Sequence, residues 1–420
     1  MALPRWAVVT HDRQSSEVVA GYYDEDGERR IEVVGARQSL NRLERSRVGF
    51  SGVNASGGRY RDRPGDNLVG RTRGMSEHTR LSRRDYLAGA GVVGTAGLAG
   101  CTGIVGSGAS SPDTLRLAYM PIYPDMQYFV MEEEGYFDDL GVDVEAQQFP
   151  DGPSIVQAYA SGKFDVAMFG IVPSMVVVDK GLSAKVVAAD IKDAMSIMTT
   201  TEFQTLWQDH GTEAFAKFEE QQGRKFRFGT FPPGSVPDIV LRYWMTEELG
   251  LDVEKTVEVV PMGASKVQQA LLAGEIDGTS IMEPIQTIAT GTDEYVRLQN
   301  AAEFFPGGQP AAVVLMNDTF RTGNSDVGQA FVEQHVRATE FIEQNPEKAA
   351  QHAVSVIGEQ NLDLETAKQA MRSPTANFVS DPHDIEGGTK IFADFAHQLG
   401  KTSEALTVDD VFDYSLYDGR

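Results

Sequence analysis

Two stretches of the chain, residues 114–173 and 225–284, show the same order of apolar and polar positions. In each stretch a short apolar run leads into an amphipathic segment, and a second apolar run, a second helical segment and a buried run follow. Each stretch therefore predicts a strand-helix-strand-helix-strand unit. The predicted strands are 115–119, 142–149 and 164–169 in the first stretch and 226–230, 256–260 and 276–282 in the second.

The two stretches are copies of one another at an offset of 111 residues. "LGVDVE" in the first matches "LGLDVE" in the second, and "DGPSIVQ" matches "MGASKVQ". The first helices are predicted over 125–134 and 236–248, and each ends before a glycine. The second helices are expected to begin with Ser154 and Ser265 as their N-caps, because a serine hydroxyl can accept a hydrogen bond from the first turn.

Repeated strand-helix-strand order predicts an α/β protein with parallel-rich sheets flanked by helices. We expect two lobes joined by hinge strands, since a long segment, 185–224, separates the copies and a strand-like run, 311–317, follows the second. A single larger doubly wound sheet is the alternative. The expected first lobe comprises 113–200 and 312–420, with most of the terminal helices packed on it, and the expected second lobe comprises 224–311.

Charge divides the chain into two differently composed parts. Residues 1–74 contain 13 Arg, no Lys and 10 acidic residues, whereas residues 102–420 contain 21 basic and 49 acidic residues. Such an acidic excess repels nucleic acid, and no nucleic-acid partner is expected. The evenly spread carboxylates resemble the surfaces of halophilic proteins, and an ordinary acidic protein is the alternative.

The single cysteine, Cys101, ends a glycine-rich apolar run. One cysteine excludes an intramolecular disulfide and sulfur-rich metal sites. Ser82 to Leu87, "SRRDYL", resembles a twin-arginine export signal with Arg83 and Arg84 at its centre, and "LAGC" at its end resembles a lipobox. The three-part order of basic, apolar and small residues is typical of export signals. We therefore expect lipidation at Cys101, which would anchor the protein to a membrane.

An export signal acts from the N-terminus, yet this one begins at Met75. The sequence thus predicts that translation starts at Met75 and that residues 1–74 are a disordered, non-native upstream extension. Residues 75–101 then form the signal with its lipobox, and the Gly/Ser-rich residues 102–112 form a flexible tether.

No common catalytic motif occurs in the chain. It has no G-x-S-x-G, no G-x-x-x-x-G-K-[ST] and no H-E-x-x-H. Neither a catalytic residue, a metal site nor a cofactor is expected.

Ligands of α/β sheets bind at the carboxyl ends of the parallel strands. The loops expected there are 121–127, 151–154 and 169–174 in the first copy and 232–238, 262–265 and 283–285 in the second. Glycines and serines at the helix starts could present N–H groups and hydroxyls to a small polar solute. The candidate ligand-binding residues are Tyr123, Gln127, Asp151, Gly152, Ser154, Phe169, Gly170, Gly234, Ser235 and Glu283.

Residues 113–420 resemble the substrate-binding lipoproteins of ABC importers of the nitrate/sulfonate/taurine class, which share a domain with thiamine-pyrimidine synthesis proteins. The resemblance is carried by "EEEGYFDDLGVDVEAQQFPDGPSIVQAYASGKFDVAMFGIVPS", "LLAGEIDGTSIMEP", "FIEQNPEKAA" and "LTVDDVFDYSLY". It implies a two-lobed fold of the periplasmic-binding-protein type (type II) in a protein of the halophilic archaeal kind. It also implies an exported, lipid-anchored, monomeric protein on the outer face of the cytoplasmic membrane, which closes on a solute and delivers it to a permease and its ATPase.

The sequence leaves the solute open. No Arg or Lys lies in the six loops, so an anion would depend on helix N-termini, whereas Asp151 and Glu283 would suit an amine, a pyrimidine or a neutral solute. Two other functions stay open as well. One is a thiamine-pyrimidine synthesis enzyme on the same fold, which a single exported cysteine disfavours, and the other is a surface-anchored sensory binding protein.

Overall fold

The computed structural model describes residues 17–23, 29–36 and 113–420. Strands β1 (Glu17–Tyr23) and β2 (Arg29–Ala36) pair antiparallel. They lie within the residues expected to be a disordered extension, so that expectation is wrong for these two strands. The proposed export signal, the lipobox cysteine and the tether lie outside the described residues.

The first lobe is built on a six-stranded sheet in the order β13-β6-β12-β5-β3-β4. Three neighbouring strands, β5, β3 and β4, are parallel, and the other three pair antiparallel. The strands of this sheet are β3 (Thr114–Tyr119), β4 (Asp143–Gln148), β5 (Val166–Gly170), β6 (Ala184–Lys192), β12 (Pro310–Asn317) and β13 (Asn377–Phe378). The central strands β5 and β12 are almost fully buried, whereas the edge strand β4 is largely exposed, which agrees with its polar sequence.

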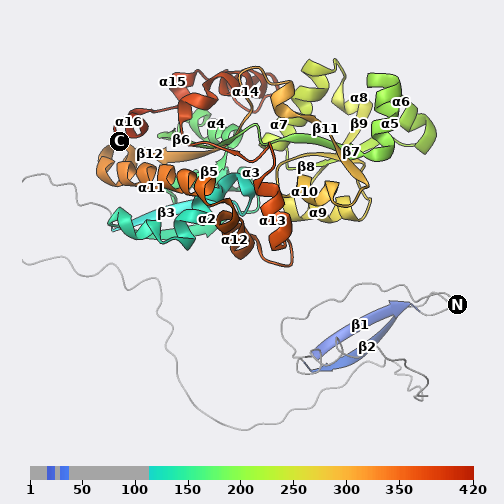
Figure 1. Cartoon of the computed structure of the whole chain (residues 1–420), viewed down its shortest axis with the longest axis horizontal. Helices are drawn as coiled ribbons and strands as arrows, with labels where there is room; N and C mark the ends of the chain where they lie inside the picture. Colours follow the sequence, from blue (N-terminus) through green and yellow to red (C-terminus); the bar gives the residue numbers. More distant parts are fainter. Residues whose placement is uncertain (1–16, 24–28, 37–112) are drawn as a thin grey trace, which may run out of the picture. The chain divides into compact units, whose positions relative to one another are not determined.

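The second lobe is built on a five-stranded sheet in the order β11-β7-β10-β8-β9. Strand β8 pairs parallel with β9 and β10, while β7 pairs antiparallel with β10 and β11. The strands are β7 (Ser196–Thr200), β8 (Phe226–Thr230), β9 (Val257–Pro261), β10 (Gly278–Ile281) and β11 (Tyr295–Asn300). Two separate sheets confirm the predicted two-lobed α/β fold and exclude the single-sheet alternative (Figure 1).

The two sequence copies fold alike. Their strands occupy the same relative positions, β4-β3-β5 in the first sheet and β9-β8-β10 in the second. An aspartate shared by the copies has the same role in both lobes. Asp165 accepts a hydrogen bond from the backbone N–H of Arg116 at 3.0 Å, and Asp277 accepts one from the N–H of Arg227 at 2.8 Å. Each carboxylate thereby ties the third strand of the unit to the first.

The helices begin and end close to the expected positions. Those of the copies and the loops between them are α2 (Met126–Glu133), α3 (Gly152–Tyr159), α4 (Ile171–Asp179), α5 (Thr201–His210), α6 (Ala214–Gln222), α7 (Val236–Tyr243), α8 (Val253–Thr256), α9 (Ala264–Leu272) and α10 (Ile285–Thr290). A single π-helical turn, Trp244–Glu248, continues α7. The expected serine N-caps are wrong for α3 and α9. Asp151 caps α3 and Gly263 stands at the N-cap of α9, so that Ser154 and Ser265 lie inside their helices.

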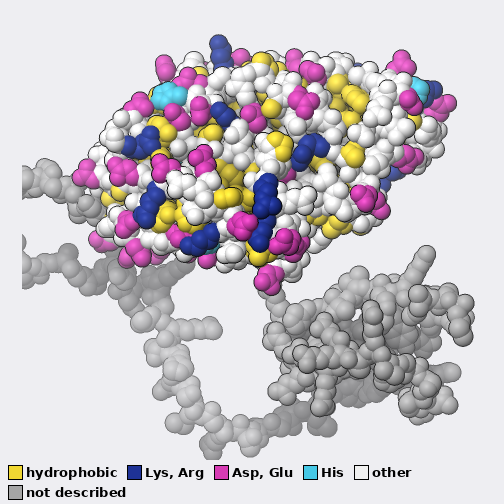
Figure 2. Space-filling view, viewed as in Figure 1, with side chains coloured by type: hydrophobic (Ala, Val, Ile, Leu, Met, Phe, Trp, Pro, Cys, Tyr) yellow, Lys and Arg dark blue, Asp and Glu magenta, His cyan; other side chains and the backbone are white. Residues whose placement is uncertain are grey.

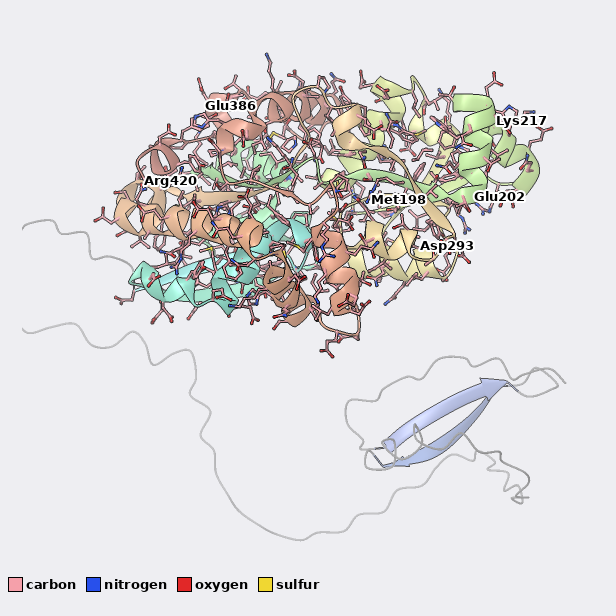
Figure 3. All side chains as sticks on the ribbon, in the orientation of Figure 1. Met198, Glu202, Lys217, Asp293, Glu386 and Arg420 are labelled. Carbon is pink, nitrogen blue, oxygen red and sulfur yellow. The ribbon has the colours of Figure 1, made fainter. Side chains whose placement is uncertain are left out.

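The C-terminal part adds α11 (Ser325–Gln344), α12 (Pro346–Ile357), α13 (Leu364–Met371), α14 (Glu386–Gln398), α15 (Val408–Val411) and α16 (Ser415–Asp418). Helices α11 and α12 pack on α2 of the first lobe, as expected. Helix α13 also contacts α10, and α14 contacts α7, so these two helices bridge to the second lobe. Figure 3 shows Glu386 and Arg420 on the first lobe and Glu202 and Lys217 on the outer helices of the second.

The chain crosses between the lobes twice. The first crossing is short, residues 193–195, and joins β6 to β7. The second, residues 301–309, joins β11 to β12. The expected boundary at residue 200 is therefore corrected, because β7 hydrogen-bonds to β10 and belongs to the second sheet. Two closely placed crossing segments are the usual architecture of a hinge.

Candidate functional site

A narrow cavity lies between the lobes, at the carboxyl ends of β3, β5, β8 and β10. Its volume is about 20 Å³, enough for one water molecule, so the lobes are closed on each other in this structure. The lining comes from the first lobe (Met120, Ile122, Pro124, Gly152, Gly170, Pro173, Ala311 and Ala312), from the second lobe (Phe231, Ser235, Val236, Pro237 and Met282) and from the crossing residue Met195. The cavity has to widen to admit a solute, which would then touch both lobes, as ligand-driven closure requires.

Three of the predicted site residues line this cavity, namely Gly152, Gly170 and Ser235. The glycines stand where two chain segments approach closely. A Cβ at Gly152 would lie 2.7 Å from Pro173 Cγ, and a Cβ at Gly170 would lie 2.9 Å from Val236 Cγ2. The second contact joins the two lobes, so the absent side chain of Gly170 permits the observed closure.

Among the described residues that line the cavity, Ser235 alone has a polar side chain. It is the N-cap of α7, and its hydroxyl accepts a hydrogen bond from the N–H of Asp238 at 3.4 Å. Gly234 precedes it with a positive φ of 89°, which a glycine adopts without strain. The prediction that a helix begins directly after this loop is confirmed.

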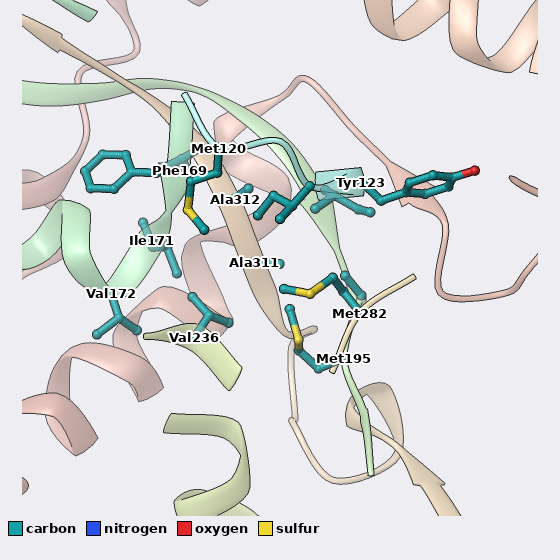
Figure 4. Packing of buried hydrophobic residues seen from close by; sticks show 14 of the residues in the cluster. Met120, Tyr123, Phe169, Ile171, Val172, Met195, Val236, Met282, Ala311 and Ala312 are labelled. Carbon is teal, nitrogen blue, oxygen red and sulfur yellow. The ribbon is translucent and has the colours of Figure 1, made fainter. Parts of the chain in front are cut away.

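Three other predicted residues are committed to the protein's own contacts. The Tyr123 hydroxyl donates to the carbonyl oxygen of Ala367 at 2.7 Å, and Figure 4 shows its ring pointing away from the lining methionines. Burial, reinforced by the Glu283 carboxylate, raises the pKa of Tyr123. Gln127 is fully buried and donates to the carbonyl oxygen of Asp190 at 2.7 Å, and Phe169 is fully buried in the core.

The predicted carboxylates bind backbone N–H groups. Asp151 accepts from the N–H of Ser154 at 2.8 Å, and Glu283 accepts from the N–H of Thr287 at 3.0 Å. Glu283 is 2% exposed and also pairs with Arg297 at 3.2 Å. The structure thus brings Gly152, Gly170 and Ser235 together at the cavity. It gives the other seven predicted residues positions in the surrounding loops and core.

Sequence reasoning missed the methionines of the lining. Met120, Met195 and Met282 come from three different segments, and Figure 4 shows the side chains of Met195 and Met282 pointing toward each other. Met120 directly follows the predicted strand 115–119 and Met282 ends the predicted strand 276–282, so their place in the chain was a usable signal. Met195 lies in the first crossing, whose boundary was misplaced. Flexible thioethers fit irregular apolar surfaces, which suits a site that opens and closes.

Polar contacts beside the cavity hold the lobes together. The Arg297 guanidinium donates to Gln286 Oε1 at 2.9 Å within the second lobe and to Ser373 Oγ at 3.3 Å after α13. Thr375 donates to Gln286 Oε1 at 2.8 Å. Farther along, Gln268 of α9 donates to the carbonyl oxygen of Asn361 at 3.0 Å. The segment around α13 therefore fastens the first lobe to the second.

Aromatic residues make a second contact between α14 and the other lobe. Tyr243 at the end of α7 stacks on Phe305 with ring centroids 4.2 Å apart and meets Phe395 of α14 edge-on at 5.3 Å. Phe305 in turn meets Phe392 of α14 at 5.0 Å. Because Phe305 lies in the second crossing, this cluster packs directly against the hinge.

A group of fully buried polar side chains lies in the first lobe behind the loop 120–125. His335 Nε2 is 2.8 Å from Asp190 Oδ1, and Asp125 Oδ2 accepts from the N–H of Met120 at 3.0 Å. Burial raises the pKa of both aspartates, and the proximity of Asp190 adds to the shift at Asp125. Burial also lowers the pKa of His335 to about 3, so this histidine is neutral at physiological pH.

Within the described residues no group of three or more His, Cys, Asp or Glu side chains could hold a metal ion. Among the described helices, none combines the length and the apolar character needed to cross a membrane.

Several known proteins with a similar chain or fold are described as binding proteins. The chain is 25% identical to a Brucella abortus protein described as a binding protein, over 294 residues that cover 69% of this chain and 85% of the other. A ligand-binding component of an ABC-type import system from Staphylococcus aureus, solved with zinc bound, superimposes with a TM-score of 0.58 at 18% identity, covering 73% of this chain and 98% of the other. The periplasmic nitrate-binding protein NrtA from Synechocystis gives a TM-score of 0.57 at 14% identity, covering 73% and 88%.

These likenesses to solved structures confirm the two-lobed fold that the sequence resemblance implied. The sequence match to a protein family extends through both copies of the repeat, the whole second sheet, the first sheet except β13, and both crossing segments. It covers residues 108–358, and the chain accordingly belongs to the NMT1-like family.

Proposed function

We propose that the folded part of this protein is the solute-binding component of an ABC importer, which captures a small molecule between its lobes and delivers it to a membrane permease and its ATPase. The observation that carries this proposal is the cavity lined from both lobes beside two short crossing segments. A solute that contacts both lobes stabilises the closed state, and closure is the signal that a permease can recognise. The binding proteins among its relatives support the same function.

A thermal-shift screen tests this proposal. The protein is heated in high salt with nitrate, sulfonates, bicarbonate, pyrimidines or amines, and a bound solute raises the melting temperature by mass action. Small-angle scattering of the same samples should show that the ligand shifts the protein toward its compact, closed form. Failure of every solute class to raise the melting temperature would contradict the proposal.

We further propose that the protein is exported through the twin-arginine signal around Arg83 and Arg84 and is anchored on the outer face of the membrane by lipid on Cys101. Support comes from the sequence alone: the order of basic, apolar and small residues before a single cysteine. In this proposal translation starts at Met75, the residues after Cys101 tether a monomeric binding protein, and the acidic surface is an adaptation to concentrated salt.

Replacement of the lipidated residue tests the anchor. Cys101→Ser should release the protein into the medium or leave its precursor uncleaved, as seen by fractionation and mass spectrometry. A matched substitution, Ser107→Ala in the tether, should leave both unchanged. A Cys101→Ser protein that is still cleaved before residue 101 and still membrane-bound would refute the anchor, and peptides from residues 1–70 in the native proteome would refute the start at Met75.

A further inference from the structure

The protein's own carboxylates occupy the loops in which an anionic ligand would find backbone N–H groups. In the first lobe Asp125 Oδ2 accepts from the N–H of Met120 at 3.0 Å, and in the second Asp238 Oδ2 accepts from the N–H of Gly234 at 2.9 Å. Both aspartates are fully buried, and each follows a proline in equivalent copies of the repeat. A buried aspartate therefore clamps the first loop of both lobes, although the N–H groups it binds, those of Met120 and Gly234, are not at equivalent positions of the repeat.

At two further helix N-termini on this side, a carboxylate of the protein also accepts a hydrogen bond from a backbone N–H group. Asp151 accepts from the first turn of α3, and Glu283 accepts from the first turn of α10. A carboxylate at a helix N-terminus satisfies its N–H groups and cancels part of its positive potential. A second anion brought to Asp151 would meet a like charge, which is unfavourable, whereas the charge of Glu283 is already paired with Arg297. Helices α4 and α9 start without a side-chain cap.

Among the described residues that line the cavity there is no Lys and no Arg. Lys401 lies beside the cavity loop outside this lining, since a Cβ at Gly234 would lie 3.6 Å from Lys401 Cδ. The Arg297 guanidinium beside it is already paired with Glu283 and bonded to Gln286 and Ser373. The face of the protein drawn in Figure 2 carries more acidic than basic side chains, and an acidic surface lowers the local concentration of anions.

The lining itself is apolar. It offers the thioethers of Met120, Met195 and Met282, the ring of Phe231 and aliphatic side chains, with the Ser235 hydroxyl as its only polar side-chain group. A full charge placed against such a surface loses its hydration without gaining a partner, whereas an apolar body gains from burial.

Building on the proposed function, we infer that the captured solute is uncharged and has an apolar body, and that the site rejects oxyanions such as nitrate and sulfonate. The clamps cancel part of the positive potential at the loops, α4 and α9 keep uncapped N-termini at this side, and the methionine-rich lining supplies contact area for the body of the solute. Selectivity then has two sources: the site lacks a positive charge for an anion, and its apolar lining favours an apolar body.

Matched ligand pairs test this inference on the full chain. Each pair is an anion and its uncharged analogue of similar shape: alkane- and arenesulfonates with the corresponding methyl sulfones, and carboxylates with the corresponding primary amides. Isothermal titration calorimetry should give at least tenfold tighter binding for the uncharged members, and nitrate should not compete. Tighter binding of the anions would overturn the inference while leaving a solute-binding protein. Absence of binding by both members and by the wider solute screen would overturn the proposed function and the inference with it.

Two variants test the role of the clamps. Asp238→Asn removes the carboxylate that neutralises Arg242 behind the cavity loop, and Asp151→Asn removes a carboxylate from a partly exposed position that is easier to change without unfolding. Each should raise the affinity for sulfonates about tenfold over wild type. The control is Asp252→Asn, the exposed N-cap of the short helix α8, which also pairs with a lysine and should leave anion binding unchanged. Unchanged sulfonate affinity in a folded Asp238→Asn or Asp151→Asn protein would refute the clamp mechanism.

Discussion

Gly170→Ala should weaken closure of the lobes more than it weakens the fold of either lobe. Gly170 ends β5 and precedes α4, and its φ of −58° and ψ of 143° are accessible to alanine, so the backbone itself creates no obstacle. The added Cβ would lie 2.9 Å from Val236 Cγ2 across the cavity and 3.3 Å from Pro173 within its own lobe. The shorter contact exists only while the lobes are closed.

The size of the effect follows from the cost of overpacking. Inserting a methyl group into a well-packed contact costs about 1–3 kcal/mol. If that cost falls on the closed state alone, solute affinity drops by about 5- to 140-fold, since about 1.4 kcal/mol corresponds to a factor of ten. The melting temperature of the ligand-free protein should fall only slightly, because the contact with Pro173 in the same lobe, at 3.3 Å, is longer than the contact across the cavity. Calorimetry with a solute found in the screen measures the first quantity and differential scanning fluorimetry the second.

Two further variants serve as controls for the effect of Gly170→Ala on solute affinity. Gly263→Ala is the matched control, because Gly263 also precedes a helix at the cleft, yet a Cβ there meets only the Pro150 carbonyl oxygen, at 4.0 Å. Val236→Ala combined with Gly170→Ala removes the clashing methyl and should restore much of the affinity. The reasoning is refuted if Gly170→Ala binds like wild type, or if Val236→Ala fails to rescue it.

Three other substitutions test separate parts of the structure. Asp277→Asn should lower the free energy of unfolding by about 1–3 kcal/mol in urea titrations, because Asp277 bonds both the Arg224 guanidinium and a strand N–H; an unchanged midpoint would contradict its role. His335→Gln should flatten the pH dependence of stability between about pH 6.5 and pH 3, whereas exposed His210→Gln should not. The folded-state pKa of His335 is about 3, below its unfolded value, so the unfolded state binds more protons in this pH range. Acidification therefore lowers the free energy of unfolding by up to about 1.4 kcal/mol per pH unit. Equal slopes of the free energy of unfolding against pH in variant and wild type would refute this. Phe392→Ala should cost about 3–5 kcal/mol, because the ring is fully buried against Phe305; chemical denaturation measures it, and a loss under 1 kcal/mol would contradict the packing.

The repeat made the fold predictable from the sequence. Two copies with the same order of apolar runs require two similar units, and the order β4-β3-β5 recurs as β9-β8-β10. The crossing points were harder to place. Ser196–Thr200 is a short buried strand with no pattern of its own that assigns it to either sheet. Its place is decided by antiparallel pairing with β10, a long-range contact that local periodicity does not contain.

The site was predictable as a set of loops but not as a set of side chains. The loops at the strand ends do meet at the cavity, because parallel strands bring their carboxyl ends to one edge. Which atoms face the cavity depends on local competition for hydrogen bonds. Asp151 and Glu283 were read as ligand contacts, yet each finds backbone N–H groups within its own helix. Tyr123 likewise turns toward the carbonyl oxygen of Ala367, which lies 244 residues away in the chain.

The two clamp aspartates, Asp125 and Asp238, are neutralised in different ways, and both ways support an uncharged solute. Asp238 pairs with Arg242 at 2.9 Å, so the second lobe places a neutral ion pair behind its loop. Among the described residues, Asp125 makes no ion pair with Lys or Arg, and burial together with the neighbouring Asp190 raises its pKa, which favours the neutral carboxylic acid. By two different routes, each clamp presents little net charge to the cavity. Both copies of the repeat keep the aspartate that binds a loop N–H group. In neither copy does this aspartate offer a net charge with which a ligand could pair.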